Sequence, residues 1–187
     1  MEMIGKKIIE VAVVVGKGEQ DFFIEKEIVI PPTCPPVYKV KDINEWVDVY
    51  DMKVICGRVL FNAYLWKDIT YKVAEKVCDE SVCGPVYHDT VKIPFGGFVE
   101  VCPDGKDGDV PVLLSACIEG KRDDWRAAPE KCGGVKGYNK LVEKTVVRLK
   151  FKVTRMEQLC IEGARTVDPD ERDEPCPCGK QGHPEEP

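Results

Sequence analysis

Residues 141–161 alternate apolar and polar side chains more regularly than any other segment of the chain. The apolar residues recur at every second position: Val147, Leu149, Phe151 and Val153. The residues between them are charged or polar: Arg148, Lys150, Lys152 and Thr154. A period of two is typical of a β-strand that buries one face, and no stretch keeps a helical period beyond about three turns. We therefore expect an all-β chain, mostly antiparallel, folded as a β-sandwich or an open barrel.

Other runs also have the composition and patterning of strands. They are 11–15, 22–30, 43–50, 53–66, 69–77 and 110–118. A turn at 16–21 (GKGEQD) is expected between the first two, because Gly16 and Gly18 supply conformational freedom. Segment 53–66 is interpreted as one strand and 69–77 as its return. One side of 53–66 would carry Ile55, Val59, Phe61, Ala63 and Leu65.

Two further segments are interpreted, one from its glycine pair and the other from its lack of a sustained hydrophobic period. Residues 88–102 are expected to form two short strands that meet at Gly96-Gly97, as a kinked strand or a tight hairpin. Residues 120–139 hold no sustained period and are interpreted as a long loop. Long loops are often binding surfaces, so Trp125 is the candidate residue for an interaction with another protein.

The composition is that of an ordinary globular protein. The chain has 187 residues, of which 43% are hydrophobic and 32% charged, with a net charge of −6. Its cationic residues are not gathered on one face, which argues against nucleic acid and membrane surfaces as partners. We expect an extended N-terminal strand at 1–15 that could serve as an assembly arm, a β domain at 16–162, and an irregular acidic tail at 163–187 that contains Pro and Cys.

The chain contains ten cysteines. Six lie in a proline-rich segment, in expected loops or in the tail: Cys34, Cys78, Cys83, Cys132, Cys176 and Cys178. These six are our candidates for disulfides between subunits, and a bond between Cys78 and Cys83 is the competing explanation. The other four lie within or beside expected strands and are predicted to be buried free thiols: Cys56, Cys102, Cys117 and Cys160.

The sequence lacks the patterns of common catalytic sites. His88 and His183 are its two histidines, and His88 is interpreted as a partly exposed polar group where a strand begins. There is no glycine-rich phosphate loop and no G-x-S-x-G elbow. We expect no catalytic residue, no cofactor and no metal. A zinc site at Cys176, Cys178 and His183 is the alternative, although their spacing fits a structural zinc site loosely.

The order of four segments resembles the SPOCS domain, the repeated module of spore coat morphogenetic proteins in endospore-forming bacteria. These segments are 13–32, 43–73, 86–101 and 141–161. The similarity runs from about Val11 to Ile161 and includes the strand that ends in Ile30-Pro31-Pro32 and the corner Ile93-Pro94-Phe95. It implies a non-enzymatic β domain that builds the protein shell, or the surface appendages, of a spore.

The resemblance and the cysteines together predict a structural subunit that self-assembles into a disulfide-crosslinked spore surface structure, either a coat layer or an appendage filament. Its partners would be other copies of itself and other spore coat proteins. Such a protein would be made in the mother-cell cytoplasm without a signal peptide and oxidised after that cell lyses. The alternative is a soluble interaction module that recruits other spore coat proteins, through Trp125 and the loop around it.

Overall fold

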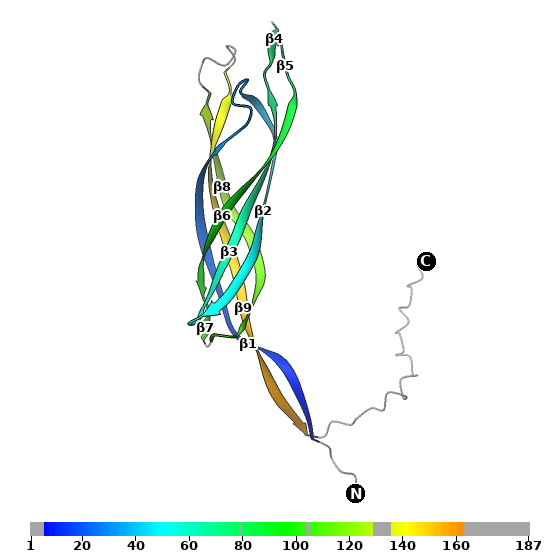
Figure 1. Cartoon of the computed structure of the whole chain (residues 1–187), viewed down its shortest axis with the longest axis vertical. Coiled ribbons are helices and arrows are strands. Elements are labelled where there is room, and N and C mark those ends of the chain that lie inside the picture. The colour runs from blue at the N-terminus through cyan, green and yellow to red at the C-terminus, as the bar shows by residue number, and fades with distance from the viewer. Residues whose placement is uncertain (1–5, 79, 104, 129–135, 163–187) are drawn as a thin grey trace, which may run out of the picture. The chain divides into compact units, whose positions relative to one another are not determined.

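The structure, a computed structural model, describes residues 6–78, 80–103, 105–128 and 136–162 (Figure 1). Within these ranges it contains strands and no helix, which confirms the all-β prediction. The strands are β1 (Lys6–Val29), β2 (Val37–Ile55), β3 (Arg58–Val73), β4 (Lys76–Cys78), β5 (Ser81–Cys83), β6 (Val86–Glu100), β7 (Cys102–Pro103), β8 (Val110–Ala127) and β9 (Tyr138–Glu162). The predicted tail at 163–187 lies outside the described residues.

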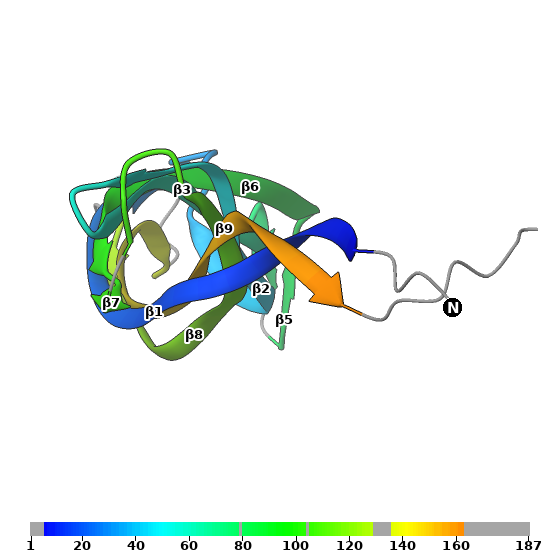
Figure 2. The same cartoon turned by 90° about the horizontal axis from the view of Figure 1, so that it is seen from below.

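Seven strands form one curled sheet. Their order is β6-β3-β2-β9-β1-β7, and β8 pairs with β9, while β4 and β5 form a separate two-stranded sheet. Although β7 follows β6 directly in the chain, the two strands stand at opposite ends of this order, because β7 pairs with Gly16 and Lys17 of β1. Within residues 12–156 the sheet therefore curls back on itself and forms the open barrel predicted from the sequence (Figure 2).

The barrel has a seam beside β2. β2 pairs with β3 along its whole length, and β9 pairs with β8 from Tyr138 to Thr154. Between β2 and β9, in contrast, the defined backbone register consists of one pair, Val37 with Tyr138. The backbone hydrogen bonds that join the other strands are therefore scarce along this seam, where β2 comes close to β8.

Alternate residues of β3 and β9 fill the interior. Every second residue is buried from Val59 to Val73 on β3 and from Leu141 to Val153 on β9. This result confirms the inward face predicted for 141–161 and, apart from the partly exposed Ile55, the inward face predicted for 53–66. β1 adds Ile24 and Ile28, and β6 adds Ile93 and Val99.

Aromatic rings from four strands meet in this core around Phe61. Its ring centroid lies 4.9 Å from that of Phe22, and 5.9 Å from those of Phe95 and Phe151. These strands, β3, β1, β6 and β9, enclose most of the barrel, so this cluster joins its walls.

On the outer face of the barrel, cations of β9 pair with carboxylates of β1. Each pair has a nitrogen–oxygen distance of 2.7 Å: Lys140 with Glu27, Arg148 with Asp21, and Lys150 with Glu19. Hydrogen bonds from these cations hold the pKa of each of the three carboxyl groups below its usual value. The ion pairs support a single alignment of β1 with β9.

The chain divides into two compact units. The larger one is the barrel, Ala12–Met156. The described part of the other consists of residues 6–11 of β1 and 157–162 of β9, which we call the terminal ribbon. Within the ribbon, Gln158 Nε2 donates a hydrogen bond to Glu10 Oε1 at 3.3 Å.

β1 is continuous, so the predicted turn at 16–21 between two separate strands is wrong. A Cβ atom at Gly18 would lie 2.0 Å from the carbonyl oxygen of Glu100. The glycine therefore lets β1 pass close to the end of β6, and it does not mark a reversal of the chain.

The glycine pair at 96–97 also lies within a continuous strand. β6 runs through it without a break, and Gly96 and Gly97 pair with Asn62 and Phe61 of β3. The tight-hairpin alternative predicted for this segment is therefore wrong, and the segment is a single strand. A Cβ atom at Gly97 would lie 2.7 Å from the ring of Phe22, so the glycine makes room for a core aromatic side chain.

A hairpin turn interrupts the segment 53–66, which was predicted to be one strand. Cys56 and Gly57 have positive φ angles of 48° and 74°, as in a two-residue type I′ turn, and Ile55 pairs with Arg58. β3 then continues to Val73, so the separate return strand at 69–77 is also wrong.

The predicted loop at 120–139 is shorter than expected, because β8 extends to Ala127 and β9 begins at Tyr138. No residue of β8 is fully buried. Its sequence therefore lacks the apolar period that identified β9, whose bounds confirm the strand predicted at 141–161.

Replacing Phe61 by Ala should lower the free energy of unfolding by about 3–5 kcal/mol, because it opens a cavity where four strands meet. Phe98 on the adjacent strand is the matched control, since its side chain is 43% exposed, and its replacement should cost about 1 kcal/mol or less. Urea unfolding measures both values. Equal losses would contradict the assigned inward face.

Candidate functional site

A lysine occupies an inward position of the barrel. Lys67 lies on β3 in phase with Leu65 and Ile69, and its side chain is 0% exposed. Lysine is almost never fully buried unless an opposite charge accompanies it. The surroundings of this ammonium group are therefore the first place to look for a site.

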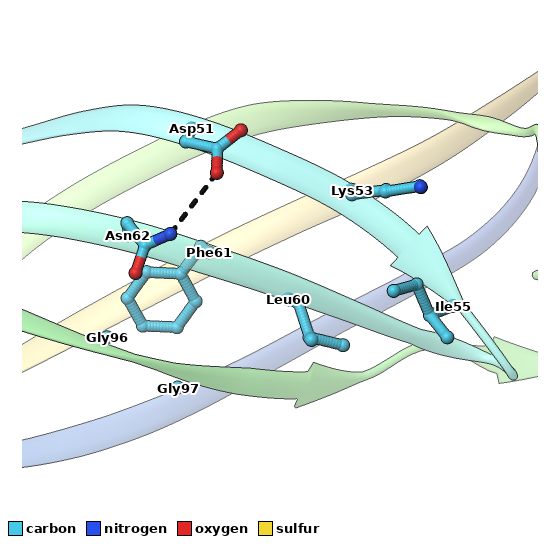
Figure 3. A pocket seen from close by; sticks show the side chains of 8 residues that line it. All are labelled: Asp51, Lys53, Ile55, Leu60, Phe61, Asn62, Gly96 and Gly97. Carbon is cyan, nitrogen blue, oxygen red and sulfur yellow. Dashed lines mark hydrogen bonds between the residues drawn. The ribbon is translucent and has the colours of Figure 1, made fainter.

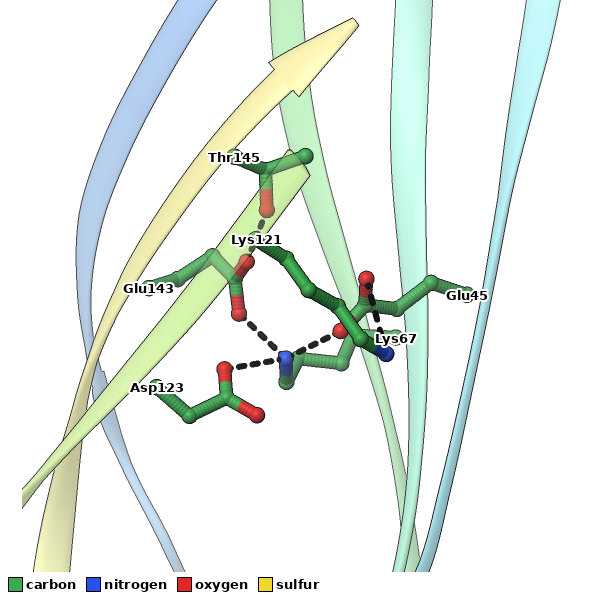
Figure 4. A network of polar contacts seen from close by, with 6 residues as sticks. All are labelled: Glu45, Lys67, Lys121, Asp123, Glu143 and Thr145. Carbon is green, nitrogen blue, oxygen red and sulfur yellow. Dashed lines mark hydrogen bonds and ion pairs between the residues drawn. The ribbon is translucent and has the colours of Figure 1, made fainter. Parts of the chain in front are cut away.

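Carboxylates from three other strands surround the Lys67 ammonium (Figure 4). Lys67 Nζ donates hydrogen bonds to Glu45 Oε1 of β2 and to Asp123 Oδ1 of β8, the latter at 2.7 Å. It also forms an ion pair with Glu143 of β9. We call these four residues the lysine cluster. Glu143, like Lys67, is fully buried, while Asp123 is 18% exposed.

Two neighbours complete the lysine cluster. Thr145 donates a hydrogen bond to Glu143, and Lys121 Nζ lies 3.5 Å from Glu45 Oε2. Glu45 Oε2 and Glu143 Oε2 are buried without a hydrogen-bond partner, so their ion pairs lack hydrogen-bond geometry. With every group ionised, three carboxylates would face two ammonium groups, which leaves one negative charge uncompensated.

Burial and the neighbouring charged groups shift the pKa values of two residues in the lysine cluster. Burial raises the pKa of Glu143 above its usual value, and the Asp123 carboxyl acts in the same direction, although Lys67 and Thr145 oppose them. Burial alone would lower the pKa of Lys67, but its hydrogen bonds and ion pairs with the three carboxylates outweigh burial and raise that pKa. These shifts favour the ammonium form of Lys67 and the protonated form of Glu143.

The three carboxylates satisfy the distance criterion for a metal site, because their oxygens lie within 4.8 Å of one another. Lys67 Nζ, however, lies among these oxygens and already neutralises them. The Lys67 ammonium therefore takes the position among the carboxylates that a metal ion would need.

A row of aromatic side chains covers the outer face of β2 and β3. Trp46 stacks on Trp66 with ring centroids 5.9 Å apart, and Tyr50 stacks on Tyr64 at 4.4 Å. Lys92 of β6 places its Nζ 3.6 Å from the centroid of the Tyr64 ring. We call these five residues the aromatic ladder. Trp46 and Tyr50 form its exposed edge.

A surface hollow lies beside the aromatic ladder, lined by Asp51, Lys53, Leu60, Asn62, Gly96 and Gly97, among others (Figure 3). Asn62 Nδ2 donates a hydrogen bond to Asp51 Oδ2 at 3.2 Å. This hydrogen bond joins β2 to β3 at the edge of the hollow.

The structure places some of the predicted site residues. Cys34 and Cys83, candidates for disulfides between subunits, are exposed and free. Cys78 ends β4, but its side chain is not described. The remaining candidates lie outside the described residues: Cys132, Cys176 and Cys178, as does His183 of the alternative zinc site. His88 is exposed, with Nε2 3.3 Å from Asp68 Oδ2.

Three cysteines predicted to be buried are exposed, and that prediction is wrong for Cys56, Cys117 and Cys160. Cys56 lies at the hairpin turn, and Cys117 pairs with the outward-facing Arg148. Cys160 lies in the terminal ribbon. The fourth, Cys102, lies in β7, where side chains are not described.

Trp125 is in β8 and not in a loop. It pairs with the buried Leu141 and packs against the hydrophobic core, with its ring centroid 5.9 Å from that of Tyr138. Its role in an interaction with another protein stays a prediction. Because the side chain packs against the core, only part of its surface is free to contact a partner.

The lysine cluster was not predicted from the sequence, although the hydrophobic pattern contains a signal for it. Lys67 falls in the same phase as Leu65 and Ile69, and Glu143 and Thr145 fall in the phase of the apolar residues of β9. A charged residue at an inward position predicts a buried partner of opposite charge.

The curled antiparallel sheet, with a closed ionic cluster inside and aromatic rings outside, defines a compact β module. Residues 36–119 match the family model described as SipL, SPOCS domain. Over these residues the chain is therefore similar to the SPOCS domain, which confirms the predicted resemblance and suggests a sporulation-related, spore coat-associated module. β1 and β9 lie outside the matched residues.

Comparison with curated proteins and with solved structures found no match. The described part of the chain contains no helix with the length and apolarity needed to cross a membrane.

Replacing Lys67 by Met should lower the free energy of unfolding by about 3–5 kcal/mol near pH 8, because it leaves buried carboxylates without their cation. The loss should be smaller at low pH. A buried carboxyl whose folded pKa exceeds its unfolded value, 4.5 for Glu143, stabilises the fold fully below that value. This contribution disappears as the pH rises through the folded pKa. Urea titrations near pH 8 and pH 4 measure both losses.

Lys140→Met is the control for this experiment, because Lys140 forms an exposed ion pair with Glu27. Its loss should stay below about 1 kcal/mol at either pH. A Lys67→Met variant that loses more stability at low pH than at high pH would contradict the buried cluster.

Proposed function

We propose that this protein is a non-enzymatic structural subunit that self-assembles at the spore surface, in a coat layer or an appendage filament. The observation that carries the proposal is the terminal ribbon. The SPOCS domain supports a location on the spore, and exposed cysteines support crosslinks between copies. In this proposal the protein is made in the mother cell without export and is oxidised after lysis.

The terminal ribbon has the properties of an unfinished sheet. Among the described strands, no third strand pairs with residues 6–11 or 157–162. Its exposed apolar side chains include Ile8, Leu159 and Ile161, which are 66%, 47% and 39% exposed. An isolated two-stranded ribbon is marginally stable, and unpaired strand edges readily accept another strand. A second copy of the chain is the partner that we propose, through strand addition.

Exposed thiols would lock such a polymer. Each of the five cysteines whose state is described is free and exposed: Cys34, Cys56, Cys83, Cys117 and Cys160. Cys160 lies on the terminal ribbon itself. Cysteines that remain reduced during synthesis could form disulfides between copies once the environment becomes oxidising.

The closed lysine cluster supports a role without catalysis on a substrate. Its central groups, Lys67 and Glu143, are fully buried among apolar side chains of the barrel. A substrate from solvent could not contact them without opening the sheet.

Substitutions in the ribbon test this proposal. Ile8→Glu and Leu159→Glu should abolish regular polymers, because they place charges on the surface where a second copy would pair. Negative-stain microscopy of oxidised and reduced protein, with non-reducing gels, measures assembly and crosslinking. Val110→Glu is the matched control, since Val110 is also exposed but lies on β8 of the barrel. Normal polymers from both ribbon variants would count heavily against assembly through the ribbon.

A second candidate function is a module that recruits other spore coat proteins. The aromatic ladder favours it, because exposed aromatic side chains are enriched in binding surfaces. Trp46 and Tyr50 would be the contact residues.

Replacing both Trp46 and Tyr50 by Ser should then reduce binding to extracted coat proteins at least about tenfold, the loss expected when interface hot spots are truncated. Circular dichroism would check that the fold is intact. Replacing Tyr38 by Ser, at another exposed site of β2, is the control. Unchanged binding by the double variant would remove this candidate.

A further inference from the structure

The lysine cluster brings together the groups that an amide-forming reaction needs. Lys67 Nζ, a primary amine when deprotonated, lies 2.7 Å from Oδ1 of the Asp123 carboxyl group. Two more carboxyl groups, Glu45 and Glu143, contact the same nitrogen. The cluster therefore holds a nucleophile, a carbonyl carbon next to it, and two groups able to move protons.

We propose that Lys67 and Asp123 condense into an intramolecular isopeptide bond, with Glu143 as the acid and Glu45 as the base. This inference goes beyond the assembly proposal and does not depend on it. The bond would join β3 to β8 through the inside of the barrel.

The reaction balances without any external reagent. Lys67 transfers a proton to the Glu45 carboxylate, and Glu143 protonates the Asp123 carboxylate. The free amine attacks Cγ of Asp123 and forms a tetrahedral intermediate. The nitrogen then returns a proton to Glu143, and Glu45 protonates the departing hydroxyl group. The carbon–oxygen bond breaks, one water leaves, and both glutamates regain their starting states.

Asp123 is the carboxyl that the geometry assigns to the bond. Thr145 holds Glu143 by a hydrogen bond, and Lys121 pairs with Glu45. Both glutamates are thereby fixed beside the reacting nitrogen, where they can exchange protons with it. Asp123 is also partly exposed, at 18%, so the water that is released has a route to solvent.

Burial removes the usual obstacle to this reaction. In water, condensation of an ammonium with a carboxylate is opposed because two well-solvated charges disappear. Here Lys67 is fully buried and Asp123 is only 18% exposed, so the two reacting groups have already lost most of their solvation. Forming a neutral amide removes one positive and one negative charge from an apolar interior. The strands also hold the amine against its target, which replaces a chance encounter with a fixed contact.

The bond would connect strands that the sheet leaves unpaired. β3 pairs with β2 and β6, whereas β8 pairs with β9. Lys67 and Asp123 are 56 residues apart in the chain. The crosslink would therefore close a long loop across the seam, and reducing agents would not break it.

The intact mass of the full chain, purified, reduced and alkylated, tests the proposal. We expect a mass lower by one water than that of the alkylated sequence. Tandem mass spectrometry after proteolysis should identify a branched peptide that joins Lys67 to Asp123. The full sequence mass in the folded wild type would overturn the proposal, and so would a lost water that maps to any other residues.

Variants test the assigned roles. Lys67→Arg and Asp123→Ala should each have the full sequence mass. Glu143→Gln should condense at least about tenfold more slowly, the smallest effect that we would accept for a lost proton donor. Unchanged condensation in this variant would overturn the role of Glu143. Lys140 and Glu27 form the internal control, because they are also 2.7 Å apart but exposed, and no branched peptide should join them. The wild-type measurement remains decisive if a variant fails to fold.

Discussion

The buried Lys67 ammonium constrains more of this structure than any other single group. Its carboxylate partners come from β2, β8 and β9, so one side chain fixes how four strands face one another. A shift of β3 by one residue would turn Lys67 toward solvent and leave those carboxylates buried without a cation. The ion pairs also bridge β2 and β8 at the seam, where β2 and β9 share one defined backbone pair. At this seam, ion pairs between side chains hold neighbouring strands together, as backbone hydrogen bonds do elsewhere in the barrel.

Strand periodicity predicted the parts of the fold in which one face is fully buried. It identified β9 and the inward residues of β3, because burial forces apolar side chains into a strict period of two. It failed for β8, which has no fully buried residue, and at Gly18, Gly96 and Gly97, where glycine makes room for a neighbouring strand or ring. The hairpin between β2 and β3 was not predicted because its first turn residue, Cys56, has a positive φ angle but is not a residue type typical of type I′ turns. These errors share a cause: the tertiary contacts that decide each case are distant in the sequence.

The candidate site was less predictable than the fold. Lys67 and Glu143 could have been recognised as charged residues at inward positions. Glu45 and Asp123 could not, because they lie on partly exposed strands without a clear alternation of apolar and polar residues. The matched SPOCS segment, 36–119, contains Glu45 and Lys67 but neither Asp123 nor Glu143. It also excludes β1 and β9, which supply the terminal ribbon and much of the core. The family match therefore covers the central part of the chain. The strands on either side of it, β1 and β9, complete the interior of the barrel and supply the ribbon proposed for assembly.

The ion pairs between β1 and β9 give the two ends of these strands different pairing selectivity. Along the barrel, Glu19, Asp21 and Glu27 of β1 match cations of β9, so an incoming strand without that charge pattern would face unpaired or like charges. In the terminal ribbon, the exposed apolar residues Ile8, Leu159 and Ile161 set no such charge requirement. In the proposed assembly, the same two strands would discriminate against foreign partners over one part of their length and accept a partner over the other. Under this proposal, the chain would pair its ribbon edge with a neighbour without exchanging the strands that hold its own barrel together.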